Sequence, residues 1–389
     1  MKMKTLPIFL AFFIMGFGDA VGTLVAFAVQ EFGISRATAG LLPFFGFVAY
    51  ALFSVPVGVL ADKRGKKFVL ILGLVIVLAG ELLPVISISK YVYLVFAIFL
   101  IGSGMTVLQV AGNPIMRDVS DPGKYSRNLT FAQFIKSIGS NTAPYVVPLA
   151  VSIGLVWTRI FTIYAAVVFV TLLAVLVLKI HETREAADKA PVSLGSSFGL
   201  LKEPFVFLMV LGIFLYVGAE VGLNSWIASY LKESFNLDIE KMATLGIGFF
   251  LTALAVGRLL GSVILSFMSA KRFFIVSSII GVLSILGLFM PVKEVAIACV
   301  FLAGLSFANI FPLIFSILID SKPEKSGELS GLLCMAIFGG AVIPYLMGLI
   351  ADSYSVLVSF VLPLLSFVFI TYLAFKSLKT EVATPAAAI

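Results

Sequence analysis

Five ionisable residues stand inside long apolar stretches of this chain: Asp19, Glu81, Lys136, Glu220 and Arg258. A charge in hydrocarbon surroundings is costly, so each residue is a candidate for ligand binding or proton transfer. Two acids facing one lysine would leave one carboxylate in surplus, and such a group can exchange a proton with its surroundings. We therefore expect Asp19 and Glu220 to carry protons, with Lys136 as their partner.

Other interpretations of these charges stay open at this stage. Lys136 and an acid can form a permanent ion pair that only holds two parts of the chain together. Arg258 can neutralise a carboxylate, bind the carbonyl end of a helix or contact a ligand. Glu81 stands near one end of its apolar stretch, where water can solvate it.

A second set of residues is neutral and polar. Amides and hydroxyls both donate and accept hydrogen bonds, as paired hydroxyl groups on a ligand require, and aromatic faces can cover its C–H surfaces. The candidates for such contacts are Gln109, Asn113, Gln133, Asn224, Trp226, Asn309, Phe311 and Tyr345. Gln133 is the strongest, because it lies three residues before Lys136 and so shares its helix face. Asn113 can instead satisfy backbone groups freed by Pro114, and Trp226 can instead lie at a membrane interface.

Composition shows what must position these side chains. The 389 residues are 61% hydrophobic and 12% charged, and mean hydropathy is +1.14, whereas soluble domains average about 25% charged residues. A membrane helix needs about 20 apolar residues. The chain is thus predicted to be an all-α membrane protein with twelve spans, at 5–30, 37–61, 67–88, 91–115, 128–152, 157–180, 204–230, 242–267, 272–291, 294–319, 329–350 and 354–376.

Basic residues predict the orientation. If both termini face the cytoplasm, nineteen lysines and arginines lie on that side, six lie outside and two lie within spans. The positive-inside rule favours this arrangement. The longest polar stretch, 181–203, then divides residues 1–180 from residues 204–389, each with six helices, and forms a cytoplasmic linker.

The two halves resemble each other at an offset near 200 residues. Gly18 matches Gly218, Pro114 matches Pro312, and the pair Gly139 and Pro144 matches Gly339 and Pro344. An even number of helices per half keeps both halves in the same orientation. Parallel repeats of this kind are typical of secondary transporters that bind substrate near the midplane between pseudo-symmetric halves.

The loop between the second and third spans carries a recognisable signature. It reads Gly58-Val-Leu-Ala-Asp62-Lys-Arg64-Gly-Lys-Lys67 and is similar to the loop motif of the major facilitator superfamily. That resemblance implies the twelve-helix major facilitator fold. Gly58 would allow close helix approach, while Asp62 and Arg64 would form a conformational latch.

A narrower resemblance covers most of the chain. The segments 108–114, 128–144, 216–222, 311–316 and 335–344 look like the fucose–galactose–glucose:proton symporter family. Its fucose branch has a glutamate where Gln109 stands, and its glucose and galactose branch has a glutamine there. The chain departs from the family in span 1, where Asp19 is the only acid, and at Lys136, where the family usually has an asparagine.

These observations together predict a cation-coupled sugar transporter of the bacterial inner membrane that works by alternating access. The alternative is a transporter of a sugar acid or another small organic anion, with Lys136 as counter-ion. We expect the partners to be a sugar, a proton or sodium ion and the lipid bilayer, with no nucleic acid, and the protein to act as a monomer. We expect no metal, cofactor or enzymatic activity, since the chain has one histidine, two cysteines and no nucleotide-binding Gly-x-x-x-x-Gly-Lys-Ser/Thr sequence.

Overall fold

The structure is a computed structural model, and it describes residues 6–39, 41–86, 90–178, 182, 192–237 and 248–379. Every one of the twelve predicted spans contains helix within these residues, and no strand occurs among them. Nine helical stretches in the described part are long and apolar enough to cross a membrane. The prediction of an all-helical membrane protein is therefore confirmed.

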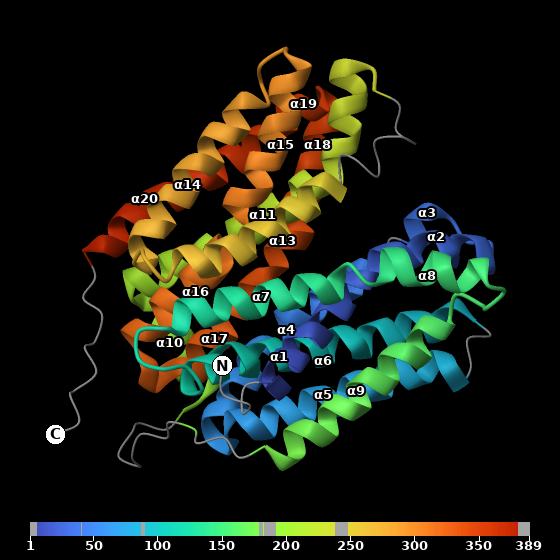
Figure 1. The fold of residues 1–389 in the computed structure, drawn as a ribbon, viewed down its shortest axis with the longest axis vertical. Coiled ribbons are helices and arrows are strands. Elements are labelled where there is room, and N and C mark those ends of the chain that lie inside the picture. Colours follow the sequence, from blue (N-terminus) through green and yellow to red (C-terminus); the bar gives the residue numbers. More distant parts are fainter. Residues whose placement is uncertain are drawn as a thin grey trace. The chain divides into compact units, whose positions relative to one another are not determined.

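The first compact unit contains residues 1–121, 135–198 and 324–335. Its helices are α1 (Leu6–Met15), α2 (Val21–Phe32), α3 (Arg36–Ala39), α4 (Leu41–Arg64), α5 (Lys66–Ile86), α6 (Tyr91–Asp118), α8 (Ala143–Ser152), α9 (Arg159–Val177), α10 (Leu194–Gly199) and α17 (Ser326–Met335). Helices α5, α6 and α9 run beside one another (Figure 1). The middle of α6 is buried over its whole circumference, so α6 is the core of this unit.

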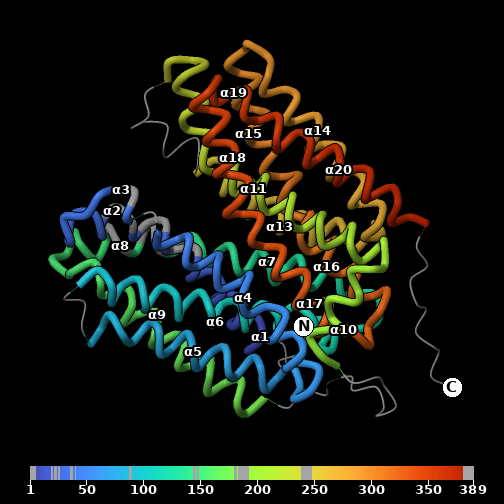
Figure 2. The backbone as a smooth tube through the Cα atoms, turned by 180° about the vertical axis from the view of Figure 1, so that it is seen from behind, coloured from blue at the N-terminus to red at the C-terminus, as the bar shows by residue number. Residues whose placement is uncertain are grey.

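The second unit contains residues 122–134, 199–323 and 336–389. Its helices are α11 (Pro204–Phe235), α13 (Gly248–Ile264), α14 (Ala270–Gly287), α15 (Lys293–Phe307), α16 (Ile310–Ser321), α18 (Gly339–Ser353), α19 (Val356–Ser359) and α20 (Val361–Leu378). Helices α14 and α20 lie side by side, as Figure 2 shows. Helix α7 (Tyr125–Ser140) contributes residues to both units.

Several predicted spans are interrupted rather than continuous. The first is broken by the 3-10 segment η2 (Gly16–Ala20), and the fifth is broken between α7 and α8. The tenth is broken at Ala308 and Asn309, and the eleventh at the 3-10 segment η6 (Ala336–Phe338). Breaks of this kind leave backbone groups for other partners and commonly occur at functional positions in transporters.

Packing at two glycines supports the internal repeat. A Cβ atom on Gly139 would meet the carbonyl oxygen of Phe13, and a Cβ atom on Gly339 would meet the carbonyl oxygen of Phe214. The glycines are 200 residues apart and their partners 201. Within each unit, therefore, equivalent helices cross at equivalent places with backbones in direct contact.

Candidate functional site

A buried glutamine lies at the centre of the first unit. Gln109 is on α6, and its Oε1 accepts hydrogen bonds from the Nζ of Lys136 at 3.2 Å and the hydroxyl of Tyr50 at 3.3 Å. The three residues come from α6, α7 and α4. Tyr50 was not predicted, because its contact depends on how α4 packs against α6.

These donors determine how the amide of Gln109 is oriented. The Lys136 ammonium can only donate, so the amide oxygen must face it. Two donors occupy the two lone pairs of that oxygen. The Nε2 of Gln109 is then the group that remains to donate toward a ligand hydroxyl.

Two further predicted contacts lie on α6 and α7, the helices that carry Gln109 and Lys136. Asn113 follows Gln109 by one turn on α6 and is fully buried, and α6 continues through Pro114 as helix. Gln133 is also buried and lies one turn before Lys136 on α7. Both positions therefore have the burial expected of residues that act inside a membrane protein.

The broken first span passes directly beside Lys136. A Cβ atom on Gly16 would meet the carbonyl oxygen of Lys136 and the backbone nitrogen of Ser140, so η2 and α7 touch there. Asp19 belongs to η2, and its side chain lies outside the described residues. The structure thus brings the two backbone segments together, and the predicted pairing of Asp19 with Lys136 stays a prediction.

Glu220 has a cationic partner within the second unit. One oxygen of its carboxylate lies 3.5 Å from the Nη2 of Arg258. The Nε of Arg258 donates to the carbonyl oxygen of Ala308 at 3.4 Å, where α15 gives way to α16. Arg258 therefore makes both of the structural contacts that were offered as alternatives, one to a carboxylate and one to a helix end.

A second contact with α13 stabilises the break in the tenth span. The Nδ2 of Asn309 donates to the carbonyl oxygen of Gly257 at 3.0 Å, and Gly261 leaves room for the Asn309 amide. Its Oδ1 is buried and has no partner among the described residues. One end of the Asn309 amide thus binds the backbone of α13, and the other end is packed against Gly261 on the same helix.

The remaining predicted contacts of the second unit differ in exposure. Asn224 on α11 has a buried Oδ1 without a described partner, and Phe311 is buried on α16. Trp226 donates from Nε1 to the carbonyl oxygen of Pro344 at 3.3 Å, which links α11 to α18. Tyr345 is 66% exposed.

Glu81 corrects one interpretation of the sequence. Its side chain was expected to be solvated near the end of its span, but the residue is only 1% exposed. The cause is helix packing: a Cβ atom on the preceding Gly80 would meet Ile101 and the carbonyl oxygen of Ala97, so α5 and α6 lie in backbone contact there.

The acid of the signature loop binds the start of a helix from the second half of the sequence. Asp62 accepts hydrogen bonds from the backbone N–H groups of Gly327 at 3.0 Å and Glu328 at 2.9 Å, at the start of α17. A Cβ atom on Gly58 would meet the backbone of Gly327 and Gly331, so α4 and α17 approach closely. Arg64 is exposed at the end of α4.

Polar contacts missed from the sequence surround this loop. The carboxylate of Glu182 accepts from the backbone N–H groups of Lys66 and Lys67 at 2.9 and 2.8 Å, which caps α5. The hydroxyls of Ser196 and Ser197 on α10 donate to Glu328 at 2.6 and 3.1 Å. The linker therefore contacts the loop and α17, a detail that sequence spacing alone does not contain.

Comparison with known families identifies the class of protein. Residues 8–343 match the Major Facilitator Superfamily, and this chain belongs to that superfamily. It is a membrane transporter and not an enzyme. The predicted fold and the family resemblance are both confirmed.

Individual relatives within this superfamily have more specific names, and several are sugar transporters. The chain is 27% identical to the glucose/galactose transporter of Brucella abortus biovar 1 (strain 9-941) over 378 residues, which cover 93% of this chain and 91% of that protein. It is 24% identical to the L-fucose-proton symporter of Haemophilus influenzae (strain ATCC 51907 / DSM 11121 / KW20 / Rd) over 417 residues, 95% of each. It resembles the crystal structure of the transporter FucP in its outward conformation, with a TM-score of 0.86 and 20% identity over 96% of this chain and 98% of that one.

Proposed function

We propose that this protein is a secondary transporter that takes up a neutral sugar together with a proton by alternating access. The observation that carries the proposal is the buried Gln109, whose amide oxygen is fixed by Lys136 and Tyr50. This arrangement presents a neutral amide donor, which suits a sugar hydroxyl. The named relatives transport glucose or galactose, or cotransport L-fucose with protons, which supports the same conclusion.

The proposal assigns roles to the predicted residues. Gln109 and Gln133 contact sugar hydroxyls, and Asn113 lies one turn from Gln109 on the same helix. The buried amide oxygen of Asn224 lacks a described partner, which supports a hydrogen bond to substrate, and Asn309 is retained as a candidate contact. Tyr345 is retained as a substrate contact. Asp19 and Glu220 take part in coupling.

Asp62, with Gly58 and Arg64, is proposed to be a latch. Two backbone N–H groups of α17 are bound by one carboxylate, and α17 comes from the second half of the sequence. A contact of this kind can hold one conformation closed and release it when α4 and α17 separate. We further propose that the protein acts as a monomer in the bacterial inner membrane, with both termini in the cytoplasm.

Uptake by proteoliposomes tests the proposed function. Purified protein is reconstituted, and neutral sugars and sugar acids are offered under an imposed proton gradient, an imposed sodium gradient or no gradient. Accumulation of glucose, galactose or another neutral sugar under the proton gradient is expected. Accumulation of sugar acids alone would contradict the neutral-sugar assignment, and accumulation under sodium alone would contradict proton coupling.

A further inference from the structure

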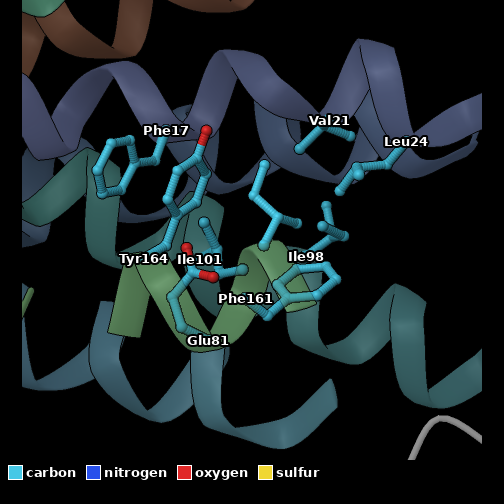
Figure 3. A pocket seen from close by; sticks show the side chains of 9 residues that line it. Phe17, Val21, Leu24, Glu81, Ile98, Ile101, Phe161 and Tyr164 are labelled. Carbon is cyan, nitrogen blue, oxygen red and sulfur yellow. The ribbon is translucent and has the colours of Figure 1, made fainter. Parts of the chain in front are cut away.

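Glu81 is a buried acid for which the function described above has no role. It lies on α5, and its side chain points into a small pocket (Figure 3). The pocket is formed by η2, α2, α5, α6 and α9, all within the first unit. Its other lining residues are Phe17, Val21, Leu24, Ile98, Ile101, Ile160, Phe161 and Tyr164.

The surroundings of the carboxyl group are almost wholly apolar. Its Oε2 is buried and has no hydrogen-bond partner among the described residues. Tyr164 is the one other titratable residue that lines the pocket, and its hydroxyl lies 2.6 Å from that of Thr142. A carboxylate without a partner is costly in such a place. The neutral acid, with its proton bound, is the form that this pocket favours.

Charged groups on the surrounding elements lie elsewhere. Apart from Glu81, none of those described lines the pocket. They stand toward helix ends, at Glu31 on α2, Asp62, Lys63 and Arg64 on α4, which packs on α5 and α6, Lys66 and Lys67 on α5, Arg117 and Asp118 on α6, and Arg159 on α9. Asp19 is on η2, and its side chain lies outside the described residues. No described cationic residue lines the pocket, so none there pairs with Glu81.

One wall of the pocket is the broken part of the first span. Phe17 belongs to η2, and its ring stacks on that of Tyr164 with centroids 3.7 Å apart and planes 4° apart. Val21 and Leu24 follow on α2. A 3-10 stretch between two α-helical segments is a common hinge. Movement at η2 would separate Phe17 from Tyr164 and admit water to Glu81.

We propose that Glu81 is a proton-binding site that couples proton movement to the transport cycle. This inference rests on the proposed function and adds a residue to it. When the pocket is open to outside water, one O–H bond forms between a carboxylate oxygen and a proton from that water. When the pocket closes, the proton stays bound. When water from the other side enters, the O–H bond breaks and the proton leaves to that water, with no electron transferred.

The test separates sugar exchange from proton-driven accumulation. Glu81→Gln keeps the shape and removes the titratable group. In proteoliposomes this variant is expected to exchange labelled for unlabelled sugar, which needs no net proton movement, and to lose accumulation under a proton gradient. Its accumulation ratio should fall to that of wild-type vesicles without a gradient. Glu294→Gln, an exposed acid on α15, is the matched control and should accumulate sugar as the wild type does.

Other results for the Glu81 variants and the wild type also bear on the proposed role of Glu81. Wild-type accumulation by Glu81→Gln would overturn it, and so would loss of sugar exchange in a monodisperse Glu81→Gln protein. If Glu81→Gln does not fold, Glu81→Asp decides: an unchanged pH profile of accumulation would overturn the inference, and a shifted profile would support it. A wild-type protein that moves no sugar would instead contradict the proposed function itself.

Discussion

The Nζ of Lys136 lies 3.2 Å from the Oε1 of Gln109, which joins α7 to α6 inside the first unit. A lysine facing an amide is not neutralised by it, so Gln109 gains a fixed orientation while the charge of Lys136 is left for other interactions. A carboxylate at position 109 would instead form an ion pair with Lys136. The pair therefore suits a site in which Gln109 binds a neutral ligand and the charge of Lys136 stabilises the ionised form of an acid.

The first prediction concerns Lys136. If Lys136 is the positive partner expected for Asp19, Lys136→Gln should alter the pH or cation dependence of transport, because that partner is lost. Affinity for a neutral sugar should change by no more than about fivefold, since one hydrogen bond contributes about 1 kcal/mol. Uptake and binding are measured from pH 5 to pH 8, because a carboxyl group in an apolar site can titrate in this range.

Two results would count against this account of Lys136. Loss of sugar-acid binding with unchanged gradient dependence would show that the lysine binds a charged substrate. A wild-type pH profile, cation dependence and affinity would leave Lys136 as a structural residue that extends its ammonium toward a polar region.

The second prediction concerns Gln133. Gln133→Ala removes one partner of a buried hydrogen bond to sugar, which costs about 1–3 kcal/mol, so affinity should fall roughly 5- to 150-fold. Isothermal titration calorimetry with the transported sugar measures the change. Ile138→Ala, at an exposed position of the same helix, is the control. Unchanged affinity in a folded Gln133→Ala protein would rule out the contact.

The third prediction concerns Asp62. An asparagine presents only one acceptor atom to the N–H groups of Gly327 and Glu328. Losing such a helix cap costs about 0.5–2 kcal/mol, so Asp62→Asn should slow transport between about 2- and 30-fold while sugar affinity changes less. Initial uptake rates and equilibrium binding are compared, with Lys63→Gln, an exposed neighbour, as control. Wild-type rates in the folded variant would remove the latch role.

The fourth prediction concerns the repeated glycine contacts. Gly139→Ala and Gly339→Ala each place a methyl group against a backbone carbonyl oxygen. Overpacking of this kind costs about 1–3 kcal/mol, so both variants should unfold at a lower temperature in detergent. Gly46→Ala is the control, because a Cβ atom there meets nothing within 4 Å. Equal melting temperatures for all three variants would contradict the packing described.

The spans themselves could be predicted because apolar length is a local property of the sequence. The breaks within them could not. Glycine and proline near Gly16, Thr142 and Phe338 resemble those in continuous membrane helices, and α6 continues through Pro114. Whether a helix breaks depends on partners from elsewhere, as the contacts of Arg258 with Ala308 and Asn309 with Gly257 show.

The candidate site was predictable in its residue types and less so in its partners. The cost of a charge in a membrane identified Glu220 and Arg258, but the partner expected for Glu220 was Lys136, and no particular acid was assigned to Arg258. Tyr50 and the linker serines could not be found, since one tyrosine or serine among many carries no distinguishing pattern. Glu81 was identified, but its burial follows from the α5–α6 approach at Gly80, which spacing does not reveal.

The most direct test of the proposed function is proton movement caused by sugar. Proteoliposomes containing the protein are suspended in a weakly buffered medium with no gradient, and a permeant counter-ion prevents build-up of a membrane potential. Adding the transported sugar outside should make the medium more alkaline as sugar and protons enter together, and an uncoupler should abolish the change. Sugar entry without any change in external pH would contradict proton-coupled sugar uptake by this protein.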